Sequence, residues 1–350
     1  MKNQNSIGST TSVAVKIAAC LLLLAALAAQ AATEEQINKR FAAQPGGTVV
    51  VDVDFGSINV STNSGSEVVV DVWRKVSRSS KSDEEKFLQD NPVKFDHEGG
   101  TVTIKCATKS VTRRSWFSFG RNQNEAKYTI TVPGQFNAQL QTAGGGIGVS
   151  ELNGKVKAHT SGGGLHFARL HGPLDGDTSG GGIEMENCEG TLKIHTSGGG
   201  IEVAGGSGSL DGDTSGGSVS VKKFRGSTHV ETSGGGISIE DVVGRIQGST
   251  SGGSIKATLP SPISDTVKLE TSGGGVTVRV PADAAFDLDA ETSAGNVHSE
   301  LPVTVAGKAE RDRLKGPVNG GGKSVWLRSS AGSIHIVRSA ETVQLESNPR

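Results

Sequence analysis

Glycine-rich loops of the kind that bind phosphate recur along this 350-residue chain. The motif Thr-Ser-Gly-Gly-Gly, or a close variant of it, begins at residues 142, 160, 178, 196, 214, 232, 250, 271, 292 and 329. A phosphate-binding loop occurs once, between a strand and a helix. Because this motif is repeated and leads each time into a strand-like pattern, we interpret its copies as turns.

Comparison of the copies separates the glycines from one another. The third glycine is replaced by Ser218, Ser254, Ser333 or Asn296, and the first by Ala294 or Ala331. The middle one never changes, so one position in each repeat demands glycine, either because its φ is positive or because a neighbouring chain segment approaches closely. These turn glycines are Gly145, Gly163, Gly181, Gly199, Gly217, Gly235, Gly253, Gly274, Gly295 and Gly332.

Two patterns of acidic and histidine side chains resemble metal sites. The stretch DGDTSGGGIEME has the spacing of a calcium loop in Asp175, Asp177, Ser179, Gly180 and Glu186, but the next copy carries a lysine in place of the glutamate. One residue before successive motifs stand His159, Asp177, His195 and Asp213, which could chelate a transition metal if the repeats stack. We favour an exposed ladder of hydrogen bonds and weak ion pairs, and expect no metal and no cofactor.

A third candidate is a set of carboxylates, Glu270, Asp289 and Glu291. Glu270 and Glu291 stand at equivalent positions of successive repeats, so we expect them to stack as like charges. Close carboxylates raise one another's pKa and form the acid/base sites of sugar-cleaving enzymes. The adjoining loops at 259–265 and 280–286 contain no arginine to hold a sugar, so we assign no catalytic residue.

An aromatic and basic cluster, RRSWFSFGR, occupies residues 113–121 in a chain with only 4% aromatic residues. If it is exposed, it could contact glycans, lipid head groups or a protein partner. If it is buried, it plugs one end of the fold. The candidate partner-contact residues are Arg113, Arg114, Trp116, Phe117 and Phe119.

The chain begins with the pattern of a secretory signal peptide. A lysine-containing polar lead precedes the apolar run IAACLLLLAALAA, and cleavage is expected between Ala31 and Ala32. The run is shorter than the ~20 residues of a membrane span, and Cys20 lies too early for a lipoprotein signal. We therefore expect a periplasmic, cell-surface or secreted protein without a membrane span after cleavage. The formal net charge of −1 without basic blocks argues against nucleic acid as a partner.

Architecture follows from the repeat. Six consecutive motif intervals are eighteen residues, and apolar residues alternate with polar ones inside each unit. This predicts an all-β fold, a single-stranded parallel β-solenoid with about eighteen residues per coil. A thirty-six-residue coil would stack Lys157 on Lys193, whereas an eighteen-residue coil places Asp175 between them, which is favourable. Cys106 and Cys188 could pair in an oxidising compartment, but Cys188 falls at a core position, which favours a buried free thiol.

The solenoid is expected to be regular over 142–338, with an insertion at 300–323 and a C-terminal tail at 339–350. Residues 32–141 form a divergent N-terminal β region with strands at 101–106 and 126–133. We expect a helix over 79–91 with a capping box of Ser82 and Glu85, a loop over 107–125, and a second helix from Thr33 to Phe41 that covers the open end.

The strand ending YTITVPGQF, the TSGGGIEV units and the stretch GPVNGGGKSVWLRSSAGSIHI resemble the bacterial putative-adhesin family of exported β-strand-repeat proteins, a domain of unknown function. The resemblance covers about residues 45–338. It implies a parallel β-solenoid, a surface or periplasmic location and an adhesive role. We therefore expect an exported, non-enzymatic protein that binds an envelope or surface protein or a glycan. The alternatives are a periplasmic sensory or regulatory binding module, contacting its partner through 73–125 or 300–323, and a carbohydrate-active β-helix enzyme.

Overall fold

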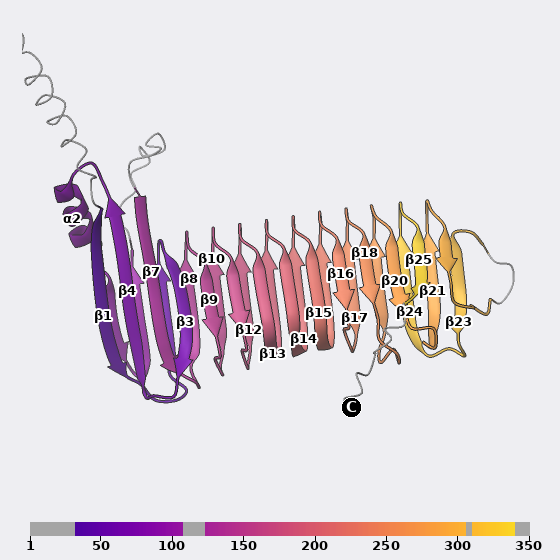
Figure 1. Cartoon of the computed structure of the whole chain (residues 1–350), viewed down its shortest axis with the longest axis horizontal. Coiled ribbons are helices and arrows are strands. Elements are labelled where there is room, and N and C mark those ends of the chain that lie inside the picture. The colour runs from indigo at the N-terminus through magenta and orange to yellow at the C-terminus, as the bar shows by residue number, and fades with distance from the viewer. Residues whose placement is uncertain (1–31, 108–122, 306–309, 340–350) are drawn as a thin grey trace, which may run out of the picture.

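Buried and exposed side chains alternate along almost every segment of the computed structural model, which describes residues 32–107, 123–305 and 310–339. In β12 (Leu174–Thr178), Leu174, Gly176 and Thr178 are buried while Asp175 and Asp177 face outward. A period of two is the signature of a strand with one buried face. The chain winds coil upon coil into the long rod of Figure 1, which confirms the predicted all-β solenoid.

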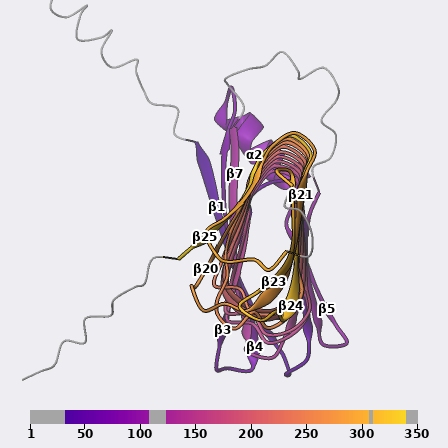
Figure 2. The same ribbon diagram turned by 90° about the vertical axis from the view of Figure 1, so that its right-hand side faces the viewer.

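The strands form two opposite walls around a narrow interior, as the view along the rod shows (Figure 2). Wall 1 is defined here by the strands that lead into each Thr-Ser-Gly corner and the strands that continue their sheet at either end, and wall 2 by those that lead out of the corner and their continuations. In spatial order, wall 1 contains β5 (Lys94–Glu98), β6 (Thr101–Cys106), β2 (Thr48–Val53), β8 (Asn137–Thr142), β10 (Val156–Thr160), β12, the second halves of β13 (Ile183–Thr196), β14 (Ile201–Thr214) and β15 (Val219–Thr232), then β17 (Ile246–Thr250), β19 (Val267–Thr271), β24 (Lys323–Ser329), β21 (Phe286–Thr292) and β23 (Arg313–Val318).

Wall 2 runs the full length of the rod opposite wall 1. In spatial order it contains β1 (Thr33–Ala42), β4 (Glu67–Ser77), β7 (Gln123–Pro133), β3 (Ser57–Asn63), β9 (Ile147–Ser150), β11 (Leu165–Ala168), the first halves of β13, β14 and β15, then β16 (Ile237–Glu240), β18 (Ile255–Thr258), β20 (Val276–Val280), β25 (Ile334–Arg338) and β22 (Val297–Ser299).

The regular coils stack in parallel with an offset of eighteen residues. Asp175 lies between Lys157 and Lys193, and Asp177 lies between His159 and His195. The predicted eighteen-residue coil is therefore confirmed, together with its alternation of opposite charges. Apolar side chains fill the space between the walls. Gly176 leaves room there, because a Cβ at this position would lie 3.0 Å from the ring of Phe167.

At both ends of the rod, the order of coils in space differs from their order in the chain. The coil of β2 and β3 lies between the later coil of β6 and β7 and the coil of β8 and β9. At the other end, the last coil, β24 and β25, lies between the coil of β19 and β20 and the earlier coil of β21 and β22. The last coil of the chain is therefore an inner coil of the stack.

Antiparallel strands close the two ends. β5 covers β6, β4 covers β7, and β1 covers β4, while β23 covers β21 at the other end. The expected helix from Thr33 to Phe41 is thus wrong, because these residues form strand β1. Ile37 and Phe41 have the spacing of one helical face, but pairing with all ten partners on β4 overrides this local preference.

The predicted helix over 79–91 is confirmed as α2 (Lys81–Asp90). Its cap differs from the expected Ser82 and Glu85. The Ser80 hydroxyl accepts a hydrogen bond from the backbone N–H of Asp83 at 3.2 Å and donates one to its carboxylate at 2.8 Å. Ser80 is therefore the N-cap residue of α2. Among the described residues, no helix is long and apolar enough to cross a membrane.

Candidate functional site: a polar groove on wall 1

The outer surface of wall 1 is hollowed along the rod. One hollow of about 450 Å3 extends from β6 to β12, and a second of about 300 Å3 extends from β12 to β15. Asp175 and Asp177 line both hollows, which therefore form one groove along the rod axis. Its charged and amide side chains are Asp52, Lys105, Gln139, Gln141, Lys157, His159, Asp175, Asp177, Lys193, His195, Asp211, Asp213, His229 and Glu231.

Ion pairs between neighbouring coils join several of the charged side chains of this groove. His159 Nδ1 lies 2.7 Å from a carboxylate oxygen of Asp177, and Lys157 Nζ lies 4.0 Å from one of Asp175. The side chains of these four residues remain 43–60% exposed. Such pairs stabilise the fold by no more than about 1 kcal/mol each, and their donors and acceptors stay accessible to a ligand.

The structure divides the calcium-like stretch between the two walls. Asp175 and Asp177 lie on β12 in the groove of wall 1, whereas Glu186 lies on the wall 2 part of β13, beside Ala168. Within the described parts of the chain, no group of three or more His, Cys, Asp or Glu side chains is arranged to hold a metal ion.

The expected stack of Glu270 on Glu291 is wrong, because β24 lies between β19 and β21. Arg328 is the neighbour of Glu270 on one side and of Glu291 on the other. Its guanidinium lies 3.0 Å from Asp289 and 3.6 Å from Glu291. Burial acts to raise the pKa of Asp289, but hydrogen bonds from Lys315 and Arg328 outweigh it and hold this pKa below its usual value. Asp289 is therefore charged and paired, unlike a general acid.

Wall 1 also carries an aromatic side chain, Trp326, near the C-terminal end of the rod, which the sequence did not predict. Trp326 on β24 has the Lys268 ammonium 4.7 Å and the Arg328 guanidinium 4.2 Å from its ring centre. These groups meet because the last coil, β24 and β25, is displaced from its place in chain order and lies next to β19. The spacing of the repeats along the chain therefore gives no indication of the cluster.

Each middle glycine lies at a corner where two coils touch. A Cβ on Gly199 would lie 2.1 Å from the carbonyl oxygen of Gly181, which no side chain can occupy. Of the two causes considered for this demand, the structure shows close approach of a neighbouring coil. Positive φ angles occur at the opposite corner instead, for example +130° at Gly190.

The threonine that begins each motif holds these corners together. The Thr196 hydroxyl donates to the carbonyl oxygen of Gly181 in the preceding coil at 2.7 Å and accepts from the N–H of Gly199 at 3.3 Å. The same pair of bonds recurs along the rod, and Ser329 substitutes for threonine in the last coil. Sequence reasoning missed this role, although the hydroxyl at the first motif position, present in every copy, was a signal for it.

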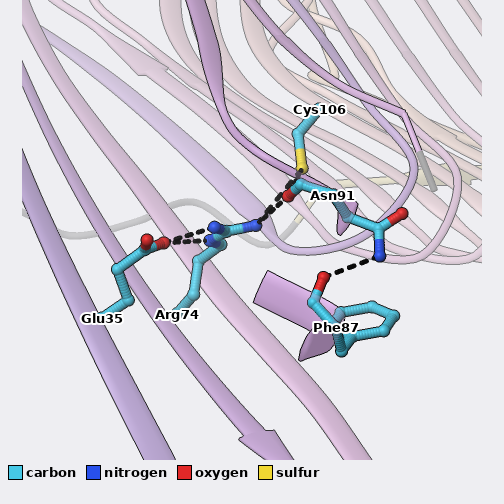
Figure 3. Close-up of polar contacts among 5 residues, drawn as sticks. All are labelled: Glu35, Arg74, Phe87, Asn91 and Cys106. Carbon is cyan, nitrogen blue, oxygen red and sulfur yellow. Dashed lines mark hydrogen bonds and ion pairs between the residues drawn. The ribbon is translucent and has the colours of Figure 1, made fainter. Parts of the chain in front are cut away.

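The cluster at 113–121, with Arg113, Arg114, Trp116, Phe117 and Phe119, lies outside the described residues. The strands before and after this cluster are β6 and β7, at the N-terminal end of the rod. This end contains a buried charged side chain, that of Arg74 (Figure 3). Arg74 of β4 is fully buried and donates to the Glu35 carboxylate through Nε at 2.7 Å and to the Asn91 carbonyl at 2.6 Å. One guanidinium nitrogen also lies 3.7 Å from the Cys106 sulfur.

The two described cysteines are free and buried, as the core position of Cys188 indicates. Burial raises the pKa of the Cys188 thiol, which keeps it protonated and unreactive. The hydroxyl of Tyr128 is also fully enclosed at this end of the rod and has no hydrogen-bond partner among the described residues. These groups are inaccessible to a macromolecular ligand and serve the fold.

Three solved structures illustrate what the chain is similar to. One described as a putative adhesin from Parabacteroides merdae is 11% identical, with 87% of this chain and 96% of that chain covered and a TM-score of 0.40. A putative adhesin from Bacteroides fragilis is 10% identical, with 87% of this chain and 97% of that chain covered and a TM-score of 0.30. A putative lipid binding protein from Parabacteroides distasonis is 11% identical, with the same two coverages and a TM-score of 0.25. At these values the similarities carry no argument about function. No curated protein matches the chain. A family model described as Toastrack DUF4097 matches residues 48–337.

Proposed function

Since the chain belongs to the Toastrack DUF4097 family, whose molecular role is open, we propose that it is an exported, non-enzymatic solenoid for interaction at the cell surface or within the envelope. The groove of wall 1 is its contact surface. The partner that this surface fits best is a linear, hydroxyl-rich glycan lying along the rod axis.

The observation that carries this proposal is the continuity of the groove over successive coils. Its lining repeats at the ~4.8 Å spacing of neighbouring strands, and each repeat offers carboxylates, imidazoles, amines or amides at the surface. A ligand that matches such a surface is itself extended and rich in hydrogen-bonding groups. Because the charges alternate, a polyanion such as nucleic acid gains little from the surface.

The proposal of a binding protein rather than an enzyme is supported by the state of the carboxylates. Glycoside hydrolysis needs one carboxyl group with a raised pKa. Asp289 has a lowered pKa and two cationic partners. Arg328 lies between Glu270 and Glu291, so these two carboxylates are not direct neighbours.

The test compares two double variants of the same repeat. Asp175→Ala with Asp177→Ala removes two carboxylates from the groove, and Glu184→Ala with Glu186→Ala removes two from the outer face of wall 2. Each pair of substitutions removes one histidine ion pair, with His159 or His166. The groove variant also removes the contact between Lys157 and Asp175, which are 4.0 Å apart. Binding of purified protein to soluble β-glucan, to pullulan, which is also linear and uncharged, and to intact bacterial cells is measured by titration and co-sedimentation.

We expect the groove variant to bind at least tenfold more weakly and the wall 2 variant to bind like the wild type. Equal binding by all three proteins would contradict the groove as contact surface. Binding to cells but to neither polysaccharide, abolished by protease treatment of the cells, would identify a protein partner instead. Protease treatment of cells that produce the protein distinguishes its locations, because only a protein displayed on the surface is digested. Release of reducing ends from either polysaccharide would contradict the non-enzymatic proposal.

A further inference from the structure

A buried carboxylate at the N-terminal end of the rod lacks an ion-pair partner. Glu84 of α2 is 2% exposed. It accepts hydrogen bonds from the Thr33 backbone N–H at 3.1 Å, from the Thr33 hydroxyl at 2.6 Å and from the Arg78 N–H at 3.0 Å. Within the described residues, no lysine, arginine or histidine nitrogen lies within 4.0 Å of it.

This carboxylate is charged at neutral pH. The hydrogen bond from the Thr33 hydroxyl, followed by that from the Arg78 backbone, lowers the pKa of Glu84. Buried charges in proteins are paired with an opposite charge. The nearest guanidinium, that of Arg78, is directed elsewhere: it donates to the Ser77 carbonyl and the Asn124 side chain, and it lies 4.3 Å over the ring of Phe87.

The open space beside Glu84 contains the start of the described chain. A hollow of about 470 Å3 is lined by Ala32, Thr33, Glu34, Arg78, Ser80, Lys81 and Glu84. Ala32 is the residue that the sequence predicts to be first after removal of the signal peptide. Its nitrogen is one residue from the Thr33 nitrogen that Glu84 already binds, and one residue spans at most ~3.8 Å between Cα atoms.

We propose that Glu84 is the docking site for the α-ammonium group of Ala32, which is created when the chain is cut between Ala31 and Ala32. This inference rests on the export part of the proposed function. In the uncut chain the same nitrogen is a neutral peptide N–H, so processing places a new positive charge beside the buried carboxylate, in addition to the more distant Arg78 guanidinium. Of the other charged groups that line the hollow, Lys81 and Arg78 oppose the ammonium and Glu34 favours it.

Docking fastens the first residues of β1, the outermost strand of wall 2, to α2. β1 also supplies Glu35, the carboxylate that pairs with buried Arg74 (Figure 3). The half-buried Glu35 on β1 and the buried Glu84 facing this strand therefore both depend on its correct position. Processing completes the cap at this end, and the precursor is the less stable form.

The experiment begins with the exported protein, whose first residue is determined by mass spectrometry. The protein that begins at Ala32 is then compared with the same protein acetylated at its α-amine, in the wild type, in Glu84→Gln and in Glu34→Gln. Thermal unfolding is followed at pH 7 and at pH 10. We expect acetylation to lower the Tm of the wild type and of Glu34→Gln by about 2 °C at pH 7, and to have no effect on Glu84→Gln.

The difference between free and acetylated wild type should disappear at pH 10, because the free amine loses its charge above about pH 8. If acetylation is silent at pH 7, or lowers the Tm of Glu84→Gln equally, the docking proposal is overturned. Should Glu84→Gln fail to fold, the pH profile of the acetylated and free wild type decides alone. A protein that is never processed contradicts the export proposal, which is a separate result from a processed protein in which acetylation has no effect.

Discussion

Single threonine hydroxyls connect the coils at every Thr-Ser-Gly corner. Thr196 is fully buried, and its hydroxyl is both donor to Gly181 and acceptor from Gly199. The corner brings backbones so close that Gly199 admits no Cβ. Water cannot replace the hydroxyl in such a contact, so its two backbone partners depend on this side chain.

Thr196→Val tests this role, because valine has the same shape and lacks the hydroxyl. It should lower the free energy of unfolding by about 1–3 kcal/mol, since two buried backbone groups lose a partner. Thr196→Ser keeps the hydroxyl, as Ser329 does in the last coil, and should cost clearly less. Urea denaturation of the two variants measures the difference, and equal losses would show that the methyl group and not the hydroxyl matters.

At the scale of elements, the sequence predicts each coil well but not which coils are neighbours. The alternation around Ile183 and Met185 and the invariant corner glycines specify one coil of eighteen residues. Because every coil offers the same corner and the same pattern of inward side chains, any coil can stack on any other. The position of β24 between β19 and β21 depends on side chains such as Arg328, whose partner Asp289 lies 39 residues away in the chain.

Local patterns at the N-terminal end were ambiguous for a related reason. Ile37 and Phe41 fit one face of a helix, yet β1 is a strand because β4 offers it a free edge and Arg74 offers a buried partner for Glu35. The candidate site was predicted in part. The ladder of His159, Asp177 and His195 follows from the repeat, whereas its continuation toward β6 depends on the position of β2 between β6 and β8, which the repeat does not indicate.

Asp289 helps to hold the displaced coil of β24 in place, because it joins β21 to Arg328 of β24 and to Lys315 of β23. Asp289→Asn should lower stability by about 1–2 kcal/mol at pH 7, as charge-assisted hydrogen bonds are lost. The folded pKa of Asp289 is below its ordinary value, so its contribution is present above about pH 4 and is lost as the pH falls through the folded pKa.

The Tm difference between wild type and Asp289→Asn should therefore shrink steadily below pH 4, as measured by scanning calorimetry from pH 7 to pH 2.5. Asp287→Asn is the matched control, since Asp287 is an exposed carboxylate two residues earlier on the same strand. A Tm difference for Asp289→Asn that persists unchanged in acid, or an equal effect at Asp287, would contradict the ion-pair account.

At the scale of the whole molecule, the exchange of coils places the coil of β2 and β3 and the last coil, β24 and β25, inside the stack. A solenoid whose first and last coils are also its outermost ones frays from its termini, because terminal coils contact a neighbour on one side only. Here β2 lies between β6 and β8, and β25 lies between β20 and β22. The outermost positions belong to β1, β5 and β23, which run antiparallel to the strands they cover, and to β22, which is parallel to β25.

Amide hydrogen exchange should therefore follow the order in space and not the order in the chain. Exchange depends on local opening, and strands with partners on both sides open least. Peptides from β2 should exchange at least tenfold more slowly than those from β5, although β2 is nearer to the N-terminus; those from β25 should likewise exchange more slowly than those from β23. Central strand β16 provides the reference. If protection instead decreases steadily toward both chain termini, the displaced coils detach first, and their position inside the stack does not stabilise the ends of the rod.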